Sequence, residues 1–375
     1  MNKRRLIATT LLTAAWVVCS SAPVQAASGK LDTGVGEKGV ALPSSPAFKV
    51  GGEKVTMDNI VRAETAKYFA EETIKTGPNK FRHEREGIKL DHQTVIRSNF
   101  DLIYSYGVFD ASKGLSVTVP AYDRYQSVQI FDENHVTLRV AYPGDTVSIT
   151  KKDLTYGDHV YLFMRTQPPS TDKAGMDVLH KRQDSVKVKA GAARPYVSEV
   201  KYDVDSFNAL RADLLKRGPA EAVLYKGFIE KLADIQPPHY QMVNLGGWGG
   251  LPATQTFYFV VLPGNKEAAA GQCSSTTFKA PDLQYKRSGY WSITVYDELG
   301  WVVTNPFKIS SLDAKPNADG SYTLNFNCGD KAINNMKVPN NWNALFRSYL
   351  PTSLESILAF EKDFTANHKV MPTGK

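Results

Sequence analysis

The chain has 375 residues, and its 45 Lys and Arg side chains against 38 Asp and Glu give a formal net charge of +7. The basic residues are scattered among acidic ones, so nothing in the charge pattern indicates a nucleic-acid partner. The length is typical of two domains.

The first 26 residues have the three-part pattern of a cleavable secretory signal peptide. Basic Lys3, Arg4 and Arg5 precede an apolar run of roughly 13 residues, and the segment ends in the small-x-small pattern Val24-Gln25-Ala26. The run is shorter than the roughly 20 apolar residues of a membrane span. We therefore expect a periplasmic or secreted protein with no membrane span after cleavage and a charge near 7 − 3 = +4. The alternative is a retained interfacial helix.

Two cysteines remain in the expected mature chain, Cys273 and Cys328. In an oxidising compartment this number predicts one disulfide, and the alternative is two separate buried thiols. Two cysteines alone cannot form a four-ligand structural zinc site.

The N-terminal third changes character twice along the chain. Residues 27–54 are rich in Gly, Ser, Pro and Lys and predict a flexible arm. Apolar residues at helical spacing then predict a helix from about residue 58 until Gly77-Pro78 ends it. The stretch from Lys80 to Asp110 is dense in polar side chains and suggests a partly buried hydrogen-bonded network.

The rest of the chain is dominated by short strands separated by turn residues, a pattern typical of antiparallel sandwiches or barrels. Strands are predicted at residues 115–119, 125–131, 137–141, 145–150, 159–165, 256–262, 289–296, 301–303 (as the hairpin partner of 289–296) and 322–327, whereas residues 341–349 are aromatic and mixed in pattern. Helices are predicted at 172–188 and 204–235, the second broken at Gly218-Pro219. The expected fold is mainly β with some helix, as two antiparallel β-sandwich domains joined by helices.

A ligand pocket is our first functional hypothesis. Arg97, Asn99 and Asp101 would share one face of a strand if the segment is extended. A face of this kind lined by tyrosines can bind a small polar or anionic ligand. The remaining members that we expect near it are Tyr104, Tyr106, Arg139 and Arg165. The alternative is a structural network in which Glu64 pairs with Arg97, because buried charges need partners in either case.

A hydrolase using the same pocket is the second hypothesis, with Asp101 as base and Tyr104 or His83 as acid. Whether the protein is an enzyme stays open at this point, and a structural envelope-associated protein is the third hypothesis. The segment Asp132-Glu133-Asn134 predicts a turn in preference to a carboxylate pair. The sequence has no His-Glu-x-x-His or Gly-x-Ser-x-Gly motif, so we predict no metal, cofactor or serine nucleophile.

Several motifs resemble secreted bacterial proteins that pair the domain of unknown function 1254 with the domain of unknown function 1214. In the first half they are Val61-Arg62-Ala63-Glu64-Thr65, Phe81-x-His83-x-Arg85-Glu86 and Gln93-Thr94-Val95-Ile96-Arg97-x-Asn99-x-Asp101. In the second half they are Trp248-Gly249-Gly250-Leu251-Pro252, Gly289-Tyr290-Trp291-Ser292-Ile293-Thr294-Val295-Tyr296, Asn317-x-Asp319-Gly320-Ser321 and Arg347-x-Tyr349-x-Pro351.

The resemblance implies an immunoglobulin-like first domain, a jelly-roll-like second domain and homo-oligomers, and it implies no reaction. We place the first domain at residues 55–200, a helical connector at 201–250 and the second domain at 251–375. The chain departs from the family pattern at Phe100, where an Arg is expected, and at Gly87, where Pro is usual.

Overall fold

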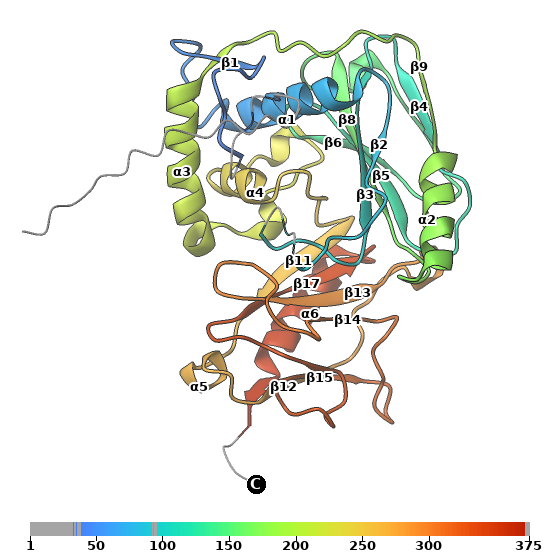
Figure 1. Cartoon of the computed structure of the whole chain (residues 1–375), viewed down its shortest axis with the longest axis vertical. Coiled ribbons are helices and arrows are strands. Elements are labelled where there is room, and N and C mark those ends of the chain that lie inside the picture. The colour runs from blue at the N-terminus through green and yellow to red at the C-terminus, as the bar shows by residue number, and fades with distance from the viewer. Residues whose placement is uncertain (1–32, 34, 36–38, 92, 94–95, 372–375) are drawn as a thin grey trace, which may run out of the picture. The chain divides into compact units, whose positions relative to one another are not determined.

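The computed structural model describes residues 33, 35, 39–91, 93 and 96–371 (Figure 1). The predicted signal peptide lies outside these residues. Among those described, no helix combines the length and apolarity that crossing a bilayer requires.

Five strands form the sheet that we call the N-terminal sheet, in the order β2-β3-β8-β5-β6. Their bounds are Arg82–His83 (β2), Ile103–Asp110 (β3), His159–Thr166 (β8), Gln126–Phe131 (β5) and Thr137–Ala141 (β6). A three-stranded sheet, β7-β4-β9, packs on one face of it. Its strands are Thr146–Ile149 (β7), Leu115–Thr118 (β4) and Lys187–Ala190 (β9). The apolar sides of these two sheets enclose one core, which includes Val117, Ile130 and Leu162.

Helices cover the other face of the N-terminal sheet (Figure 1). They are Ile60–Thr76 (α1), Val204–Glu221 (α3) and His239–Gly247 (α4), whereas Lys173–Ser185 (α2) lies beside the three-stranded sheet in Figure 1. Phe69 of α1, Phe207 of α3 and Leu245 of α4 share a core with Tyr161 of β8. Along each strand, the residues on this face therefore alternate with the residues that point into the sandwich core.

The second group of strands starts with the C-terminal sheet, in the order β11-β17-β13-β14. Its strands are Thr256–Val261 (β11), Asn343–Tyr349 (β17), Trp291–Tyr296 (β13) and Lys308–Ser310 (β14). A further sheet has the order β16-β15-β12-β18, and its strands are Asn335–Met336 (β16), Tyr322–Phe326 (β15), Ser274–Phe278 (β12) and His368–Val370 (β18). The helices of this part of the chain are Lys266–Ala269 (α5) and Leu354–Ala366 (α6). An aromatic core that includes Phe278, Trp291, Phe346 and Phe360 lies between these elements. The mainly β architecture is therefore confirmed.

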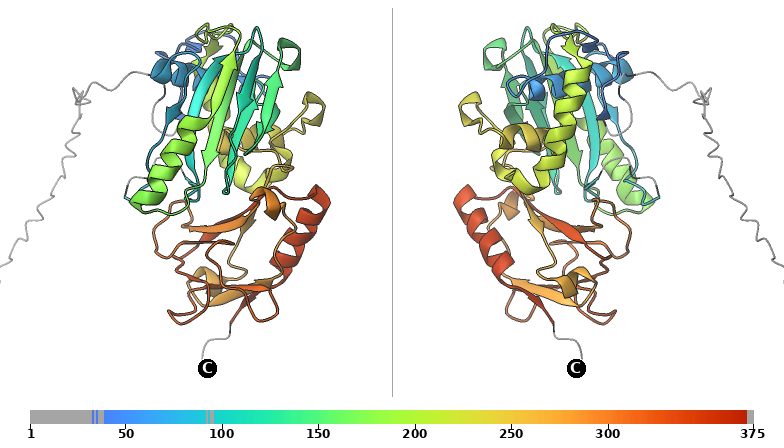
Figure 2. Two further views of the ribbon diagram at one scale, coloured as in Figure 1. Left: turned by 90° about the vertical axis from the view of Figure 1, so that its right-hand side faces the viewer. Right: turned by 90° about the vertical axis from the view of Figure 1, so that its left-hand side faces the viewer.

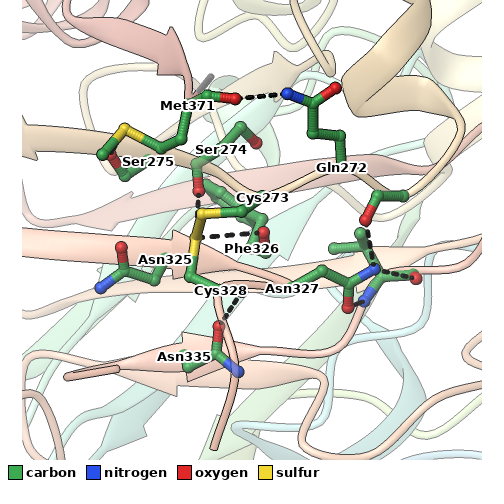
Figure 3. Close-up of a disulfide and its surroundings, with 12 residues drawn as sticks. Gln272, Cys273, Ser274, Ser275, Asn325, Phe326, Asn327, Cys328, Asn335 and Met371 are labelled. Atoms are coloured by element: carbon green, nitrogen blue, oxygen red, sulfur yellow. Dashed lines mark hydrogen bonds between the residues drawn. A yellow bond between two sulfur atoms is a disulfide. The ribbon is translucent and has the colours of Figure 1, made fainter. Parts of the chain in front are cut away.

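The predicted disulfide between Cys273 and Cys328 is present (Figure 3). It joins the residue before β12 to the end of the neighbouring strand β15, where Ser274 is paired with Phe326. The bond closes a loop between positions 55 residues apart.

Three local predictions differ from the structure. Helix α3 continues through Gly218-Pro219, because Pro219 falls in its last turn and the Ala222 N–H still donates to the Gly218 carbonyl at 2.8 Å. Trp301 does not start a hairpin strand, because the Asp297 side chain accepts its N–H at 2.8 Å and folds the chain into a loop. The next strand along the chain, β14, pairs with β13 instead, on the side opposite to β17.

The third difference concerns the expected flexible arm. Ala41, Ala47 and Phe48 are buried in the helical core, and Phe48–Lys49 (β1) pairs in parallel with Tyr202–Asp203 (β10). These few apolar residues have no helical or strand periodicity, so the sequence pattern did not indicate that they pack.

Candidate functional site

Residues 97–101 lie along the polar face of the C-terminal sheet, and we call this segment the strap. Its polar contacts follow one another residue by residue. The Arg97 N–H donates to the Gly300 carbonyl at 2.7 Å, and the Arg97 carbonyl accepts from Arg347 at 3.1 Å. The Ser98 carbonyl accepts from the Tyr296 hydroxyl at 2.7 Å, and the Asn99 side chain donates to the Tyr349 hydroxyl at 2.7 Å. The Phe100 carbonyl accepts from Lys308 at 3.0 Å. The strap thus joins the two groups of strands through its backbone.

Asp101 ends the strap and is its only carboxylate, with 7 % of its surface exposed. One carboxylate oxygen accepts from the Ser292 hydroxyl at 2.5 Å, and the other lies 3.3 Å from the Lys308 ammonium. Its backbone N–H donates to the Asn99 side chain at 2.9 Å. Both oxygens are therefore already engaged by the C-terminal sheet.

The expected strand face of Arg97, Asn99 and Asp101 is wrong. Strand β3 begins only at Ile103, and Arg97 has a φ of 52°, in the left-handed region that breaks an extended segment. The segment leaves the strand conformation because its backbone groups bond to side chains of the C-terminal sheet instead of a neighbouring strand.

Glu64 does not pair with Arg97. Its carboxylate binds Lys67 at 2.9 Å and Arg211 at 3.1 Å, and the Glu64 and Lys67 side chains are fully buried between α1 and α3. Glu64 therefore belongs to a network between α1 and α3, and the strap belongs to a separate network with the C-terminal sheet.

Two arginines are buried near the strap without an acidic partner. Arg165 on β8 is 5 % exposed and Arg347 on β17 is 2 % exposed. Within the described residues, no carboxylate oxygen lies within 4.0 Å of either guanidinium group; the Asp101 charge acts on Arg347 only from a greater distance. Arg165 donates to Gln129 at 3.1 Å and to the Gly249 carbonyl, and Arg347 donates to Tyr296 at 2.8 Å and to Thr294 at 3.1 Å. All these acceptors are neutral, so neither charge is neutralised by direct contact.

A tyrosine lies next to each arginine in the strand register. Tyr104 of β3 is opposite Arg165, and Tyr258 of β11 is opposite Arg347. Burial raises the pKa of Tyr104 to about 12, while the charges of Arg165 and Arg347 act in the opposite direction. Because both guanidinium groups act on this hydroxyl, the two Arg–Tyr pairs face a common region.

The charges around this region do not balance. Asp101 pairs with Lys308, whereas Arg165 and Arg347 have no carboxylate oxygen within 4.0 Å among the described residues, so two positive charges remain in excess. The buried Tyr290 hydroxyl has no partner in hydrogen-bonding geometry, although its ring stacks on Tyr349 at 4.1 Å. A region with excess positive charge is suited to an anion.

Of the other candidates from the sequence, His83 and Arg139 lie elsewhere, whereas the Tyr106 ring is next to that of Tyr104, with 6.2 Å between the ring centroids. His83 of β2 bonds to Ser105 at 2.7 Å, on the opposite face of β3 from Tyr104, so the acid–base pair with Asp101 does not form. Tyr106 lies under the Arg82 guanidinium at 4.7 Å, and Arg139 is solvent-exposed and pairs with Asp153 at 3.0 Å.

His83 also lies 3.8 Å from Asp184, which gives a Ser–His–Asp series with Ser105. The Ser105 side chain is 0 % exposed and accepts a second hydrogen bond from Gln183 at 3.3 Å. The Ser105 oxygen is therefore engaged by both His83 and Gln183 in the structure, whereas a nucleophile needs only its base as partner.

Sequence reasoning missed the residues of the C-terminal sheet. Ser292, Lys308 and Arg347 complete the site from the second half of the chain. The polar Ser292 and Thr294 alternate with apolar Trp291, Ile293 and Val295, and this alternation was the signal that one face of β13 meets polar partners.

Two open hollows of about 450 and 520 Å³ flank residues 330–335. Neither includes the strap or the two buried arginines. Among the described residues, no group of three His, Cys, Asp or Glu side chains is placed to hold a metal ion.

Comparison with known families gives two matches. The family model described as Protein of unknown function (DUF1254) matches residues 78–156, and Protein of unknown function (DUF1214) matches residues 264–353. Both families of the resemblance are therefore matched by segments of this chain. The strap and Tyr104 belong to the DUF1254 match, whereas Ser292, Lys308 and Arg347 belong to the DUF1214 match. The site therefore brings together residues from the two segments that match these family models.

One solved structure supports the fold, and a second is similar only in part. The crystal structure of the VPA0106 protein from Vibrio parahaemolyticus has a TM-score of 0.57 at 15 % identity, covering 84 % of this chain and 98 % of that one. A putative uncharacterized protein from Burkholderia cenocepacia has a TM-score of 0.42 at 13 % identity, covering 78 % and 83 %. No curated protein matches the chain.

Glu133, in the turn after β5, is a buried carboxylate outside the site. It is 5 % exposed and accepts a hydrogen bond from the Tyr196 hydroxyl at 2.8 Å. Burial raises its pKa from 4.5 to about 7, against the lowering effect of the Tyr196 bond. The folded state therefore binds this proton more tightly than the unfolded chain does.

This carboxylate predicts a pH dependence of stability. A raised folded pKa contributes stability that is fully present below about pH 4.5 and is lost as the pH rises through about 7. We expect Glu133→Gln to raise the free energy of unfolding by about 2 kcal/mol at pH 8 and to change it little at pH 4.5. Urea unfolding at both pH values measures this, and an equal effect at both would contradict the assignment.

Proposed function

We propose that the protein binds a small anion between its two domains, in the region that Arg165, Arg347 and Tyr104 face. The observation that carries the proposal is the pair of buried guanidinium groups without a carboxylate within 4.0 Å among the described residues. Leaving a buried charge uncompensated is costly, so an anion at this position gains from charge-assisted hydrogen bonds.

In this proposal the ligand contacts are the two Arg–Tyr pairs, whereas the sequence predicted the side chains of the strap. Asp101, Asn99 and the strap backbone are already bonded to the C-terminal sheet, which supports a role for them in holding the domains together. Arg165 and Arg347 have only neutral acceptors, which supports their role in binding.

Thermal unfolding with a panel of small solutes tests the proposal. At millimolar inorganic phosphate, acetate or succinate, we expect at least one anion to raise the Tm of the wild type, whereas glucose leaves it unchanged. At a concentration 100 times the Kd, the stabilisation is about 2.7 kcal/mol. Sodium chloride at matched ionic strength corrects for general salt effects.

Variants separate binding from nonspecific stabilisation. Arg165→Met and Arg347→Met should each abolish the shift, and Arg139→Met, which removes an exposed arginine paired with Asp153, should keep it. If no anion raises the Tm, or if the shift survives in both buried-arginine variants, the proposal fails and the region serves only to join the domains.

We also propose that the mature protein is exported, to the periplasm or beyond the cell. The leader pattern of residues 1–26 and the disulfide support this, since disulfides persist in oxidising compartments. The intact mass of the protein from the envelope fraction tests it, because retention of residues 1–26 there would contradict cleavage.

A further inference from the structure

The outward face of the three-stranded sheet β7-β4-β9 consists only of hydroxyl and lysine side chains. Strand register places Ser148, Ser116 and Lys189 in one row and Thr146, Thr118 and Lys187 in the next. Alternate residues of the same strands point inward to the sandwich core. Figure 2, left, views the molecule from the side on which β9 and β4 lie in Figure 1.

Three lysines follow one edge of this face. Lys187 and Lys189 are two residues apart on β9, which spaces their Cα atoms by about 7 Å. Lys113 extends the row, because a Cβ at Gly191, the next outward position, would lie 2.9 Å from the Lys113 Cβ. All three are exposed, and within the described residues none has a carboxylate oxygen within 4.0 Å. The row is therefore a line of unpaired positive charges.

The rest of the face carries no opposing charge in its two rows. The Thr118 and Thr146 hydroxyls bond to each other at 3.0 Å, which holds this part of the face together. Two carboxylates flank the far edge: Asp153 accepts from Thr150 and pairs with Arg139 at 3.0 Å, and Asp145, next to Thr146, lies 3.6 Å from Arg287. The positive charge of the lysine row is thus not neutralised by its surroundings.

We propose that this face binds a linear acidic polysaccharide, with the three lysines along its charged groups and the Ser and Thr hydroxyls bonding to its sugar hydroxyls. The evenly spaced charges fit a polymer with repeated anionic units. Single-stranded nucleic acid fits less well, because the two rows offer no aromatic side chain on which bases could stack.

The lysines have a second role that alone would account for two of them. Strand β9 is at the edge of its sheet, and edge lysines discourage pairing with another chain. That role does not require Lys113, which is outside the strand, or a face without acidic residues. Binding and edge protection therefore make different predictions for a charge-reversed variant.

Isothermal titration calorimetry of the full mature chain with sodium polygalacturonate tests the proposal. We expect binding that weakens as salt rises from 0.05 to 0.3 M, since exposed charges are screened, and no binding to neutral dextran. Lys187→Glu with Lys189→Glu should weaken binding at least tenfold. Lys331→Glu with Lys369→Glu changes the net charge equally at exposed positions elsewhere and should bind like the wild type.

Three results would overturn the proposal: no binding to polygalacturonate, equal binding by both double variants, or tighter binding to oligo(dT) or to phosphatidylglycerol vesicles. Circular dichroism checks that the variants fold. Should the charge-reversed face variant fail to fold, Lys187→Gln with Lys189→Gln takes its place, and the same loss of binding is expected.

Discussion

Asp101→Ala is expected to lower the free energy of unfolding by about 3 kcal/mol, because it leaves buried cations without their one counter-charge. The carboxylate accepts from Ser292 and lies 3.3 Å from Lys308, and its charge also acts on Arg347. Partial exposure of Lys308 lets that ammonium reach water, which keeps the loss below the upper end of the range for buried pairs.

Urea unfolding measures this loss, and two variants control it. Asp101→Asn keeps an oxygen acceptor for Ser292 but removes the charge, so its loss should be smaller. Asp177→Ala removes a carboxylate whose partner, Lys173, is almost fully exposed, and should cost at most about 0.5 kcal/mol. A loss for Asp101→Ala no larger than for Asp177→Ala would show that the strap does not depend on this charge.

Loss of the disulfide is expected to have the largest effect on stability. Replacing Cys273 and Cys328 by serine frees a loop of 55 residues in the unfolded chain, which lowers the free energy of unfolding by about 4 kcal/mol on the loop-entropy model. We expect the variant to keep the β12–β15 pairing in the folded state, because the backbone hydrogen bonds of the two strands do not require the disulfide.

Chemical denaturation of the double variant under oxidising conditions measures the effect. Wild-type protein treated with a reducing agent should match the variant, which separates the bond itself from the substituted side chains. A difference of less than 1 kcal/mol between oxidised wild type and variant would mean that the unfolded chain is already compact without the bond.

The regular elements were predictable because their signals are local. Strand β6 has the predicted bounds of Thr137 and Ala141, and the strands β5 and β8 differ from prediction by one residue. Their alternating or continuous apolar residues report burial on the sheet faces directly. The pairing of Cys273 with Cys328 was predictable for a simple reason, since only two cysteines follow residue 26.

The site was only half predictable because its contacts are not local. Polar density before β3 indicated Asn99, Asp101 and Tyr104, all of which lie at the domain junction. Their partners are about 190 to 250 positions further along the chain, and no periodicity links such distant segments. The left-handed Arg97 was also invisible, because only the bonds to Gly300 and Arg347 favour that conformation.

The strap has a consequence for how the two domains can be inherited. A chain that acquired a different second domain would have to reproduce hydroxyl, ammonium and guanidinium groups at the positions of Ser292, Lys308 and Arg347 to receive residues 97–101. We therefore expect substitutions on the two sides to be coupled, so that a change at Asp101 is tolerated best together with one at Lys308. The two segments would then change together at this contact, even though each matches a family model of its own.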